Sequence, residues 1–298
     1  MPGHPVHVWW AGLADAHGGL LALLDPVERR RYEATVDPAG RGRFLVGCAL
    51  SRLVLGELLG LPPADVPLRR VCPRCGGPHG KVRLDLPPSG PPSGPPSGPP
   101  SGPPSGPSSG PPSKRPGPDF SVAHSGAVIG VAVCENGRVG LDVEEADVGL
   151  DVDSAARVAL ADSELAALYG LPPAARKSAF LRTWTRKEAV LKALGVGLGA
   201  PLRALELSRP EQPPAVLAWP EQLGQLGQLD ARPDLSLRLT DLLVDGKHPA
   251  AVAVAATPTE AGADGGVRVT EPPGGVRVTV RDGSAALAAY VRGATVRP

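Results

Sequence analysis

The sequence predicts a mixed α+β fold that is interrupted by a low-complexity insertion. Two long segments, residues 38–59 and 173–194, carry apolar residues at helical spacing. Short, mostly apolar segments such as 128–134 and 139–143 are typical of strands. From Pro87 to Ser113 the chain becomes a PPSG repeat, which has little to bury and cannot offset its ordering entropy. We expect this repeat to be a disordered linker in the first half of the chain, tolerated because loop closure entropy grows slowly with length.

The N-terminal elements carry clear boundary signals. His7 to Trp10 is predicted to be a short strand, and Pro26 occupies the first position of a helix that extends to Thr35. Asp37 is the expected N-cap of a longer helix that reaches about Leu59. Gly60, followed by two prolines, ends that helix.

After the linker, strands and helices alternate less regularly. Residues 128–134 and 139–143 are predicted to pair as a hairpin, because Glu135-Asn136-Gly137 between them is a typical turn. Two helices are expected at 162–169 and 173–194. Weaker strand signals lie at 203–207, 216–219, 236–243 and 250–256. The tail contains GGVRVT twice and a short helical pattern at 284–292, and we assign it no function.

Composition narrows the functional class. The 298 residues suffice for a sizeable core, and the net charge of +1 gives no overall field that favours nucleic acid or an anionic membrane surface. Four cysteines are too few for a disulfide framework in a chain of this length. We see neither a signal peptide nor an apolar stretch of membrane-spanning length. We therefore expect a cytoplasmic protein that binds neither nucleic acid nor membrane.

The first chemical motif is a pair of carboxylates on one strand. Side chains alternate along a strand, so Asp142 and Glu144 share one face while Val139, Leu141 and Val143 share the other. Two carboxylates about 7 Å apart repel each other unless a cation lies between them. Hard oxygen ligands suit Mg²⁺, which completes its shell with water and substrate phosphate. A solvated acidic strand end is the alternative, since such triplets are common.

The second motif is the helical segment WTRKEAVLK, residues 184–192. Trp184, Glu188 and Lys192 lie one turn apart on one face, so Glu188 can supply a third carboxylate and Lys192 can reach an anion. Lys187 lies beside them at a different angle. Ordinary ion pairing between Glu188 and Lys192 is the alternative explanation. Against it, only six of the 31 basic residues are lysine, and two of those six fall in this segment.

A third motif, FSVAHSG at residues 120–126, is a strand that runs into a glycine turn and places His124 where it can donate to a phosphate. Taken in order, HSG, DxE and WTxKExxxK are similar to the motifs of the 4'-phosphopantetheinyl transferases. The longer, monomeric kind that activates nonribosomal peptide and polyketide synthases fits best. The resemblance covers about residues 5 to 256, apart from the linker.

The resemblance implies two similar α/β halves related by a pseudo-twofold, with coenzyme A in the cleft between them. The first half would comprise residues 1–138, with the linker at 87–113, and would bind coenzyme A. The second half, residues 139–257, would carry the magnesium and catalytic motifs, and residues 258–298 would form the tail. The implied reaction transfers 4'-phosphopantetheine from coenzyme A to a serine of an apo acyl or peptidyl carrier protein domain.

The resemblance also implies roles for individual residues. Magnesium would be bound by Asp142, Glu144 and Glu188, and Glu188 would accept the proton of the carrier serine. Lys187 and Lys192 would hold phosphates and support catalysis. Coenzyme A would be contacted by Arg43, Phe44, Lys81, His124, Ser125, Lys187 and Lys192. Ala123 and Val82 depart from the family pattern, which often has Ser or Thr before the histidine and Pro after Gly80-Lys81.

Three other functions are alternatives to this one. Cys72 and Cys75, followed by His79, are compatible with zinc, but the chain has no second CxxC pair. A catalytically inactive relative that binds coenzyme A or carrier proteins should have lost a motif carboxylate or lysine, and all are present. A magnesium-dependent phosphohydrolase would need a water-activating group and a leaving-group acid, and the sequence shows no separate pair of this kind. For carrier recognition Arg176, Lys177 and Arg182 are candidates, with a solvated helix face as the alternative.

Overall fold

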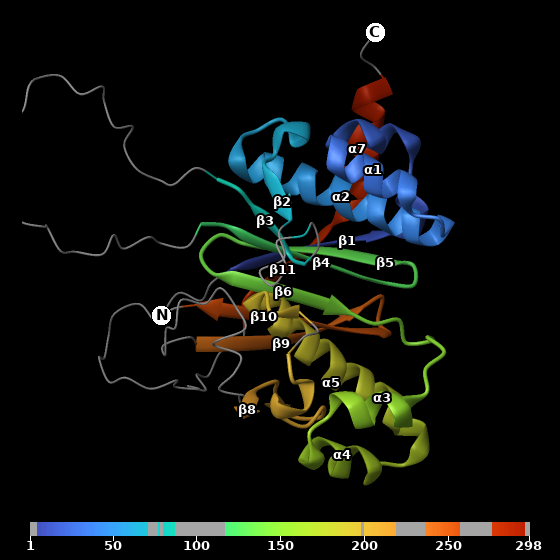
Figure 1. Ribbon diagram of the computed structural model, residues 1–298, viewed down its shortest axis with the longest axis vertical. Helices are drawn as coiled ribbons and strands as arrows, with labels where there is room; N and C mark the ends of the chain where they lie inside the picture. Colours follow the sequence, from blue (N-terminus) through green and yellow to red (C-terminus); the bar gives the residue numbers. More distant parts are fainter. Residues whose placement is uncertain are drawn as a thin grey trace, which may run out of the picture.

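The computed structural model describes residues 5–70, 77, 80–86, 117–197, 200–218, 236–256 and 276–295. Two central sheets are covered by helices on both sides, so the mixed α+β prediction is confirmed (Figure 1). The first sheet has the order β11 (Val278–Asp282), β1 (Val6–Gly12), β5 (Val128–Cys134), β4 (Asp119–Ser125). The second has the order β6 (Arg138–Val143), β10 (His248–Ala256), β9 (Ser236–Val244).

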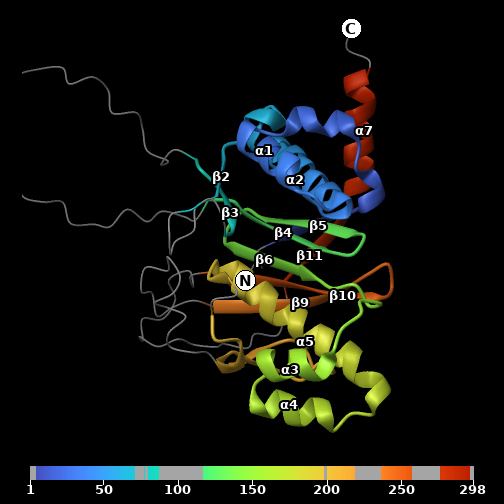
Figure 2. The same ribbon diagram turned by 45° about the vertical axis from the view of Figure 1, so that its right-hand side comes forward.

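The helices lie in two groups on opposite sides of the strands, as both ribbon views show (Figure 2). One group comprises α1 (Pro26–Ala34), α2 (Pro38–Leu59) and α7 (Gly283–Thr295), and the other comprises α3 (Val152–Ala159), α4 (Asp162–Tyr169) and α5 (Pro173–Leu194). Two small ribbons pair β2 (Leu68–Arg70) with β3 (Val82–Leu84) and β7 (Glu206–Leu207) with β8 (Val216–Ala218). Short 3-10 turns occur at Leu13–Asp15, Gly18–Leu23, Pro63–Asp65 and Leu202–Ala204.

The predicted helix boundaries agree closely with this structure. Asp37 caps α2 by accepting a hydrogen bond from the Gly40 backbone N–H, and Gly60 ends it in the left-handed conformation at φ 65°. The helices predicted at 162–169 and 173–194 have the same bounds in the structure. Gly195, with φ 72°, ends α5 in the same way as Gly60 ends α2.

The two sheets pack face to face through apolar side chains. From β6, Val139, Leu141 and Val143 enter this shared core, as the alternation predicted. The opposite face of β6 carries Gly140 and Asp142 toward α5. All seven residues of β5 are buried because α2 covers one of its faces and the second sheet covers the other.

Gly140 lets α5 approach β6 closely. A Cβ at this position would lie 1.9 Å from the Ala189 backbone oxygen and 2.5 Å from the Ala193 nitrogen. We expect Gly140→Ala to push helix from strand and to lower the free energy of unfolding by at least about 1–3 kcal/mol in urea titrations. Gly149→Ala, where a Cβ would meet nothing within 4 Å, is the matched control. Equal stability of both variants would contradict this account of the packing.

The predicted hairpin between 128–134 and 139–143 is wrong. β5 is flanked by β1 and β4, so both of its edges are occupied, and the chain crosses through Gly137 to the other sheet, where β6 pairs with β10. The hairpin that forms instead joins β4 to β5, with Ser125 opposite Val128. Its turn begins at Gly126, whose φ of 53° suits glycine.

Side chains of β4 join the two sheets. Two backbone N–H groups on the edge of β6 that does not pair with β10 donate to side chains of β4. The Val139 N–H donates to Asp119 Oδ2 at 2.9 Å, and the Leu141 N–H donates to Ser121 Oγ at 3.0 Å. These contacts satisfy edge groups that would otherwise be buried without partners. They also fix β4 next to β6, which places the HSG strand beside the DxE strand.

The described end of the tail belongs to the first sheet. β11 pairs in parallel with β1, and α7 packs on α2 with Leu287 buried in the core there. The boundaries predicted at 138 and 257 stay predictions. The CPRC segment, the PPSG repeat and the first GGVRVT copy lie outside the described residues.

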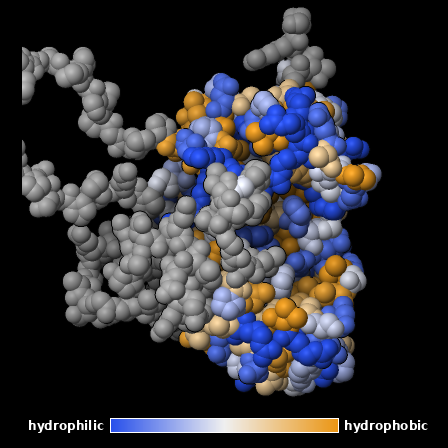
Figure 3. Space-filling view, in the orientation of Figure 1, coloured by the Kyte–Doolittle hydropathy of each residue, from blue (hydrophilic) through white to orange (hydrophobic). Residues whose placement is uncertain are grey.

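The surface mixes hydrophilic and hydrophobic residues. On the face drawn in Figure 3, hydrophilic residues spread over both helical layers and are interrupted by small hydrophobic groups. Among the described residues, no helix is both long and apolar enough to cross a bilayer.

Candidate functional site

A cleft of about 760 Å³ lies between α2 and α5, above β4. One wall is formed by the α2 face that carries Phe44, Cys48 and Ser51. The lining includes six basic side chains: Arg31, Arg43, Arg70, Lys81, His124 and Lys192. Two acidic side chains, Glu28 and Glu188, also line it. Such an excess of positive charge in a concave site favours an anionic ligand.

Asp142 lies next to this cleft, behind Lys192. Its Oδ1 accepts a hydrogen bond from Lys192 Nζ at 2.7 Å, while Oδ2 is buried without a partner in the structure. Burial raises the pKa of Asp142 to about 7; Lys192 opposes this shift and Glu144 and Glu188 add to it. Its Oδ2 can therefore accept a proton or a further cation.

Glu188 projects from α5 into the cleft, one turn before Lys192. Its Oε1 is also buried without a partner. Burial raises the pKa of the Glu188 carboxyl, Lys192 lowers it, and the charge of Glu144 raises it further. These charge effects on the pKa values show that Asp142, Glu144 and Glu188 lie within electrostatic reach of one another.

Glu144 differs from the other two because both of its oxygens have donors. Trp184 Nε1 donates to Oε1 at 3.0 Å, and Ser125 Oγ donates to Oε2 at 2.8 Å. Ser125 was predicted to contact coenzyme A, but in this structure its hydroxyl is directed to Glu144 instead.

The donor set fits magnesium. Two buried carboxylate oxygens, on Asp142 and Glu188, have no partner, and all three acidic groups are hard oxygen ligands. In the described part of the chain, no three or more His, Cys, Asp or Glu side chains form a group that could hold a metal ion as the side chains stand. Water and phosphate would therefore have to supply further ligands, as is usual for Mg²⁺.

The residues predicted to contact coenzyme A surround the same cleft. Arg43 donates to the Gly126 carbonyl at 3.1 Å and lies near Asp37, while Arg31 lies 5.7 Å above the Phe44 ring. His124 is exposed at the end of β4. Partial desolvation of this exposed ring where it lines the cleft, followed by the charges of Lys192 and Arg43, lowers the pKa of His124, so an anionic ligand would favour its protonation.

Lys81 lines the cleft and also contacts both β4 and β6, where the two sheets meet. Its Nζ donates to Asp119 Oδ2 and to the Val139 carbonyl, the latter at 2.8 Å. Burial lowers the pKa of Lys81, and the adjacent Asp119 carboxylate opposes that shift. Ala123, where the family often has a hydroxyl, faces the core between the sheets and is 1% exposed.

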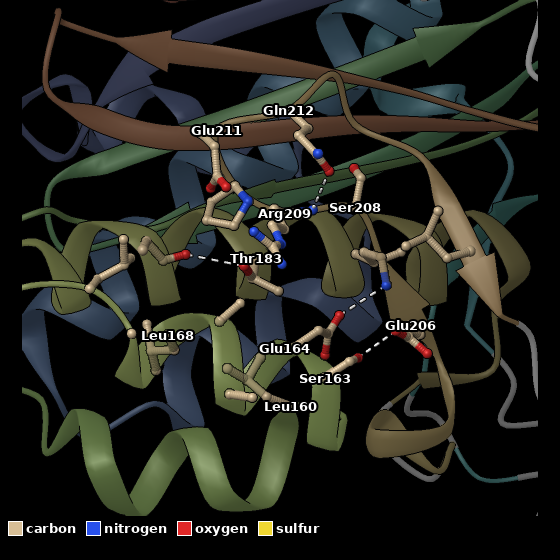
Figure 4. Close-up of a pocket in the computed structure, with 18 residues that line it drawn as sticks. Leu160, Ser163, Glu164, Leu168, Thr183, Glu206, Ser208, Arg209, Glu211 and Gln212 are labelled. Carbon is tan, nitrogen blue, oxygen red and sulfur yellow. Dashed lines mark hydrogen bonds between the residues drawn. The ribbon is translucent and has the colours of Figure 1, made fainter.

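The structure does not bring Lys187 to the cleft. Its Nζ is buried on the other side of α5, where it pairs with Glu164 and donates to the carbonyls of Ala159, Leu202 and Leu205. Glu164 lies at a second pocket, between α4, α5 and the segment 206–212 (Figure 4). The predicted phosphate contact of Lys187 disagrees with this geometry, because all of its donor capacity is used inside the second half.

Some residues of the site had no assigned role in the sequence. Trp184 was predicted to share a helix face with Glu188 and Lys192. Its hydrogen bond to Glu144, forty residues earlier, could not be predicted, because no local sequence pattern reports such a contact. Arg70 lines the cleft and follows no recognisable motif. Arg186, inside the helical motif, is buried and binds Asp241 through two nitrogens, so its role is to hold α5 to β9.

Of the carrier-recognition candidates, two already have partners. Arg176 donates to the carbonyls of Leu171 and Tyr169, and Arg182 donates to the carbonyl of Pro210. These contacts fix helix ends and loops of the second half. A role in carrier recognition stays a prediction.

Comparison with known proteins supplies independent information. Residues 138–253 match the family described as the 4'-phosphopantetheinyl transferase superfamily. The chain is 28% identical over 221 residues to 4'-phosphopantetheinyl transferase HetI of Nostoc sp., covering 72% of this chain and 80% of that protein. It is 27% identical over 184 residues to slr0495 of Synechocystis sp., whose name gives the same activity provisionally. That alignment covers 62% of each protein.

Proposed function

We propose that this protein transfers the 4'-phosphopantetheine moiety of coenzyme A to a serine of an apo carrier protein domain and releases 3',5'-ADP. The match of residues 138–253 to the 4'-phosphopantetheinyl transferase superfamily supports this proposal. The observation that supports this most is the position of Glu188 and Lys192. Both line the basic cleft, Lys192 donates to Asp142, and Glu188 lies within electrostatic reach of Asp142.

The reaction is the attack of a serine hydroxyl on the β-phosphate of coenzyme A. A bond forms between the serine oxygen and that phosphorus, the pyrophosphate bridge breaks, and the electron pair leaves with 3',5'-ADP. Protein groups contribute mainly by positioning and by neutralising charge. The cleft suits this task, because Arg43, Lys81, His124 and Lys192 supply cations around a concave site.

Glu188 is the proposed base. Its partnerless Oε1 is free to accept the proton of the serine hydroxyl, and the burial that raises its pKa brings its basicity closer to neutral pH. Asp142, Glu144 and Glu188 would hold Mg²⁺, which when bound would polarise the phosphates and offset the charge of the leaving group. Lys192, held by Asp142, would keep a fixed positive charge next to the phosphates.

The family resemblance supports further detail. We propose that the two halves, each a sheet with a long helix on its outer face, are related by a pseudo-twofold. The acceptors would be acyl or peptidyl carrier domains of polyketide and nonribosomal peptide synthases. The protein would act as a monomer in the cytoplasm.

Intact-protein mass spectrometry tests the proposal. Purified protein is mixed with coenzyme A, Mg²⁺ and an apo acyl or peptidyl carrier domain. We expect the carrier to gain the mass of one phosphopantetheine, and we expect EDTA to abolish the gain. A carrier domain with its acceptor serine replaced by alanine is the control. If coenzyme A binds but neither carrier type gains mass, the protein is a binding relative and not a transferase.

A further inference from the structure

The Glu144 carboxylate is held between the two halves of the molecule. One donor, Ser125, ends β4 in the first half, and the other, Trp184, lies on α5 in the second. An indole N–H can only donate, so Glu144 Oε1 must be an acceptor. Ser125 Oγ accepts from the Glu145 backbone N–H at 3.0 Å, which leaves its own proton for Glu144 Oε2.

The indole donor is held in place by its surroundings. Trp184 stacks on Phe180, one turn earlier in α5, with ring centroids 6.1 Å apart and an interplanar angle of 28°. It also packs on the apolar cluster formed by α3, α4 and α5. The turn that contains Gly126 directly follows Ser125, and a Cβ on Gly126 would lie 2.2 Å from the Glu145 carboxylate. Both donors therefore occupy fixed positions relative to β6.

We propose that Trp184 and Ser125 are positioning residues that orient Glu144 for metal binding. Each carboxylate oxygen accepts more than one hydrogen bond or ligand, so the two donors leave capacity for a cation. Asp142 and Glu188 lack such a pair of donors, and each keeps a buried oxygen without a partner. Loss of a group that orients a metal ligand commonly costs about 10–100-fold in metal affinity. This inference rests on the proposed function for the identity of the metal site.

Direct metal binding tests the inference without a carrier substrate. Mn²⁺, which favours the same oxygen ligands as Mg²⁺, is titrated into the full chain with and without coenzyme A and followed by electron paramagnetic resonance. We expect Trp184→Phe and Ser125→Ala each to weaken Mn²⁺ binding by about 10-fold or more. Trp9→Phe is the matched control, because Trp9 lies on the first sheet under Arg281. In transfer assays, excess Mg²⁺ should restore the kcat of both variants.

The possible outcomes separate the two proposals. If both variants bind Mn²⁺ as tightly as the wild type, or if Trp9→Phe weakens binding equally, the positioning role is overturned. If Mn²⁺ binding depends on both residues but no carrier is modified, the positioning role stands and the transferase proposal fails. Wild-type protein that binds no Mn²⁺ under either condition overturns both. If Trp184→Phe does not fold, Ser125→Ala decides alone.

Discussion

Replacing Glu188 with glutamine should lower the kcat of carrier modification by roughly 10²–10⁴-fold, the usual contribution of a general base. Glutamine keeps the shape of the side chain but cannot accept the serine proton or provide a negative charge to the metal. Because Glu188 Oε1 has no partner in the fold and burial raises the pKa of the carboxyl, its charge does not stabilise the native state. The Tm of Glu188→Gln should therefore equal or exceed that of the wild type.

The combination of lost activity and retained stability is the diagnostic result. Single-turnover kinetics and calorimetric unfolding measure the two quantities, and coenzyme A binding should remain, because the basic cleft residues are intact. Glu57→Gln, an exposed change on α2, is the control. A variant that keeps more than a tenth of wild-type kcat would show that another group accepts the proton.

How far the sequence predicted the fold can be judged from particular elements. The caps at Asp37 and Gly60 and the proline at Pro173 are local signals, so the long helices were predicted within one residue. The hairpin at Asn136-Gly137 failed because strand pairing depends on which edges are free, and β4 and β1 already occupy both edges of β5. The pairing of β11 with β1 joins the two ends of the chain, which no local pattern reports.

The same distinction holds for the site. Alternation along β6 correctly predicted that Asp142 turns away from the core residues Leu141 and Val143. Helical spacing correctly placed Glu188 and Lys192 together, and both line the cleft. Lys187 and Lys192 are five residues apart on α5 and therefore face different sides of the helix. The sequence could not predict their environments, because what covers each side of the helix depends on the tertiary structure.

Replacing Lys187 with methionine should cost stability and leave chemistry almost unchanged. Lys187 is fully buried, and its ammonium pairs with Glu164 at 2.6 Å and donates to three carbonyls. Removing one partner of a buried ion pair leaves the other charge uncompensated and typically costs about 3–5 kcal/mol. At about 2–4 °C per kcal/mol for a chain of moderate size, the Tm should fall clearly in calorimetry. Lys177→Met, on the same helix, is the control.

A double variant distinguishes a structural lysine from a phosphate-binding one. Glu164→Gln removes the charge that Lys187→Met leaves unpaired, so the stability loss of the double variant should be smaller than the sum of the two single losses. Measured at a temperature where it is folded, Lys187→Met should keep a kcat and a KM for coenzyme A within a few-fold of the wild type. If it instead raises that KM strongly while the Tm stays constant, the lysine reaches a phosphate during the reaction. The contacts to Ala159, Leu202 and Leu205 would then have to break when coenzyme A binds.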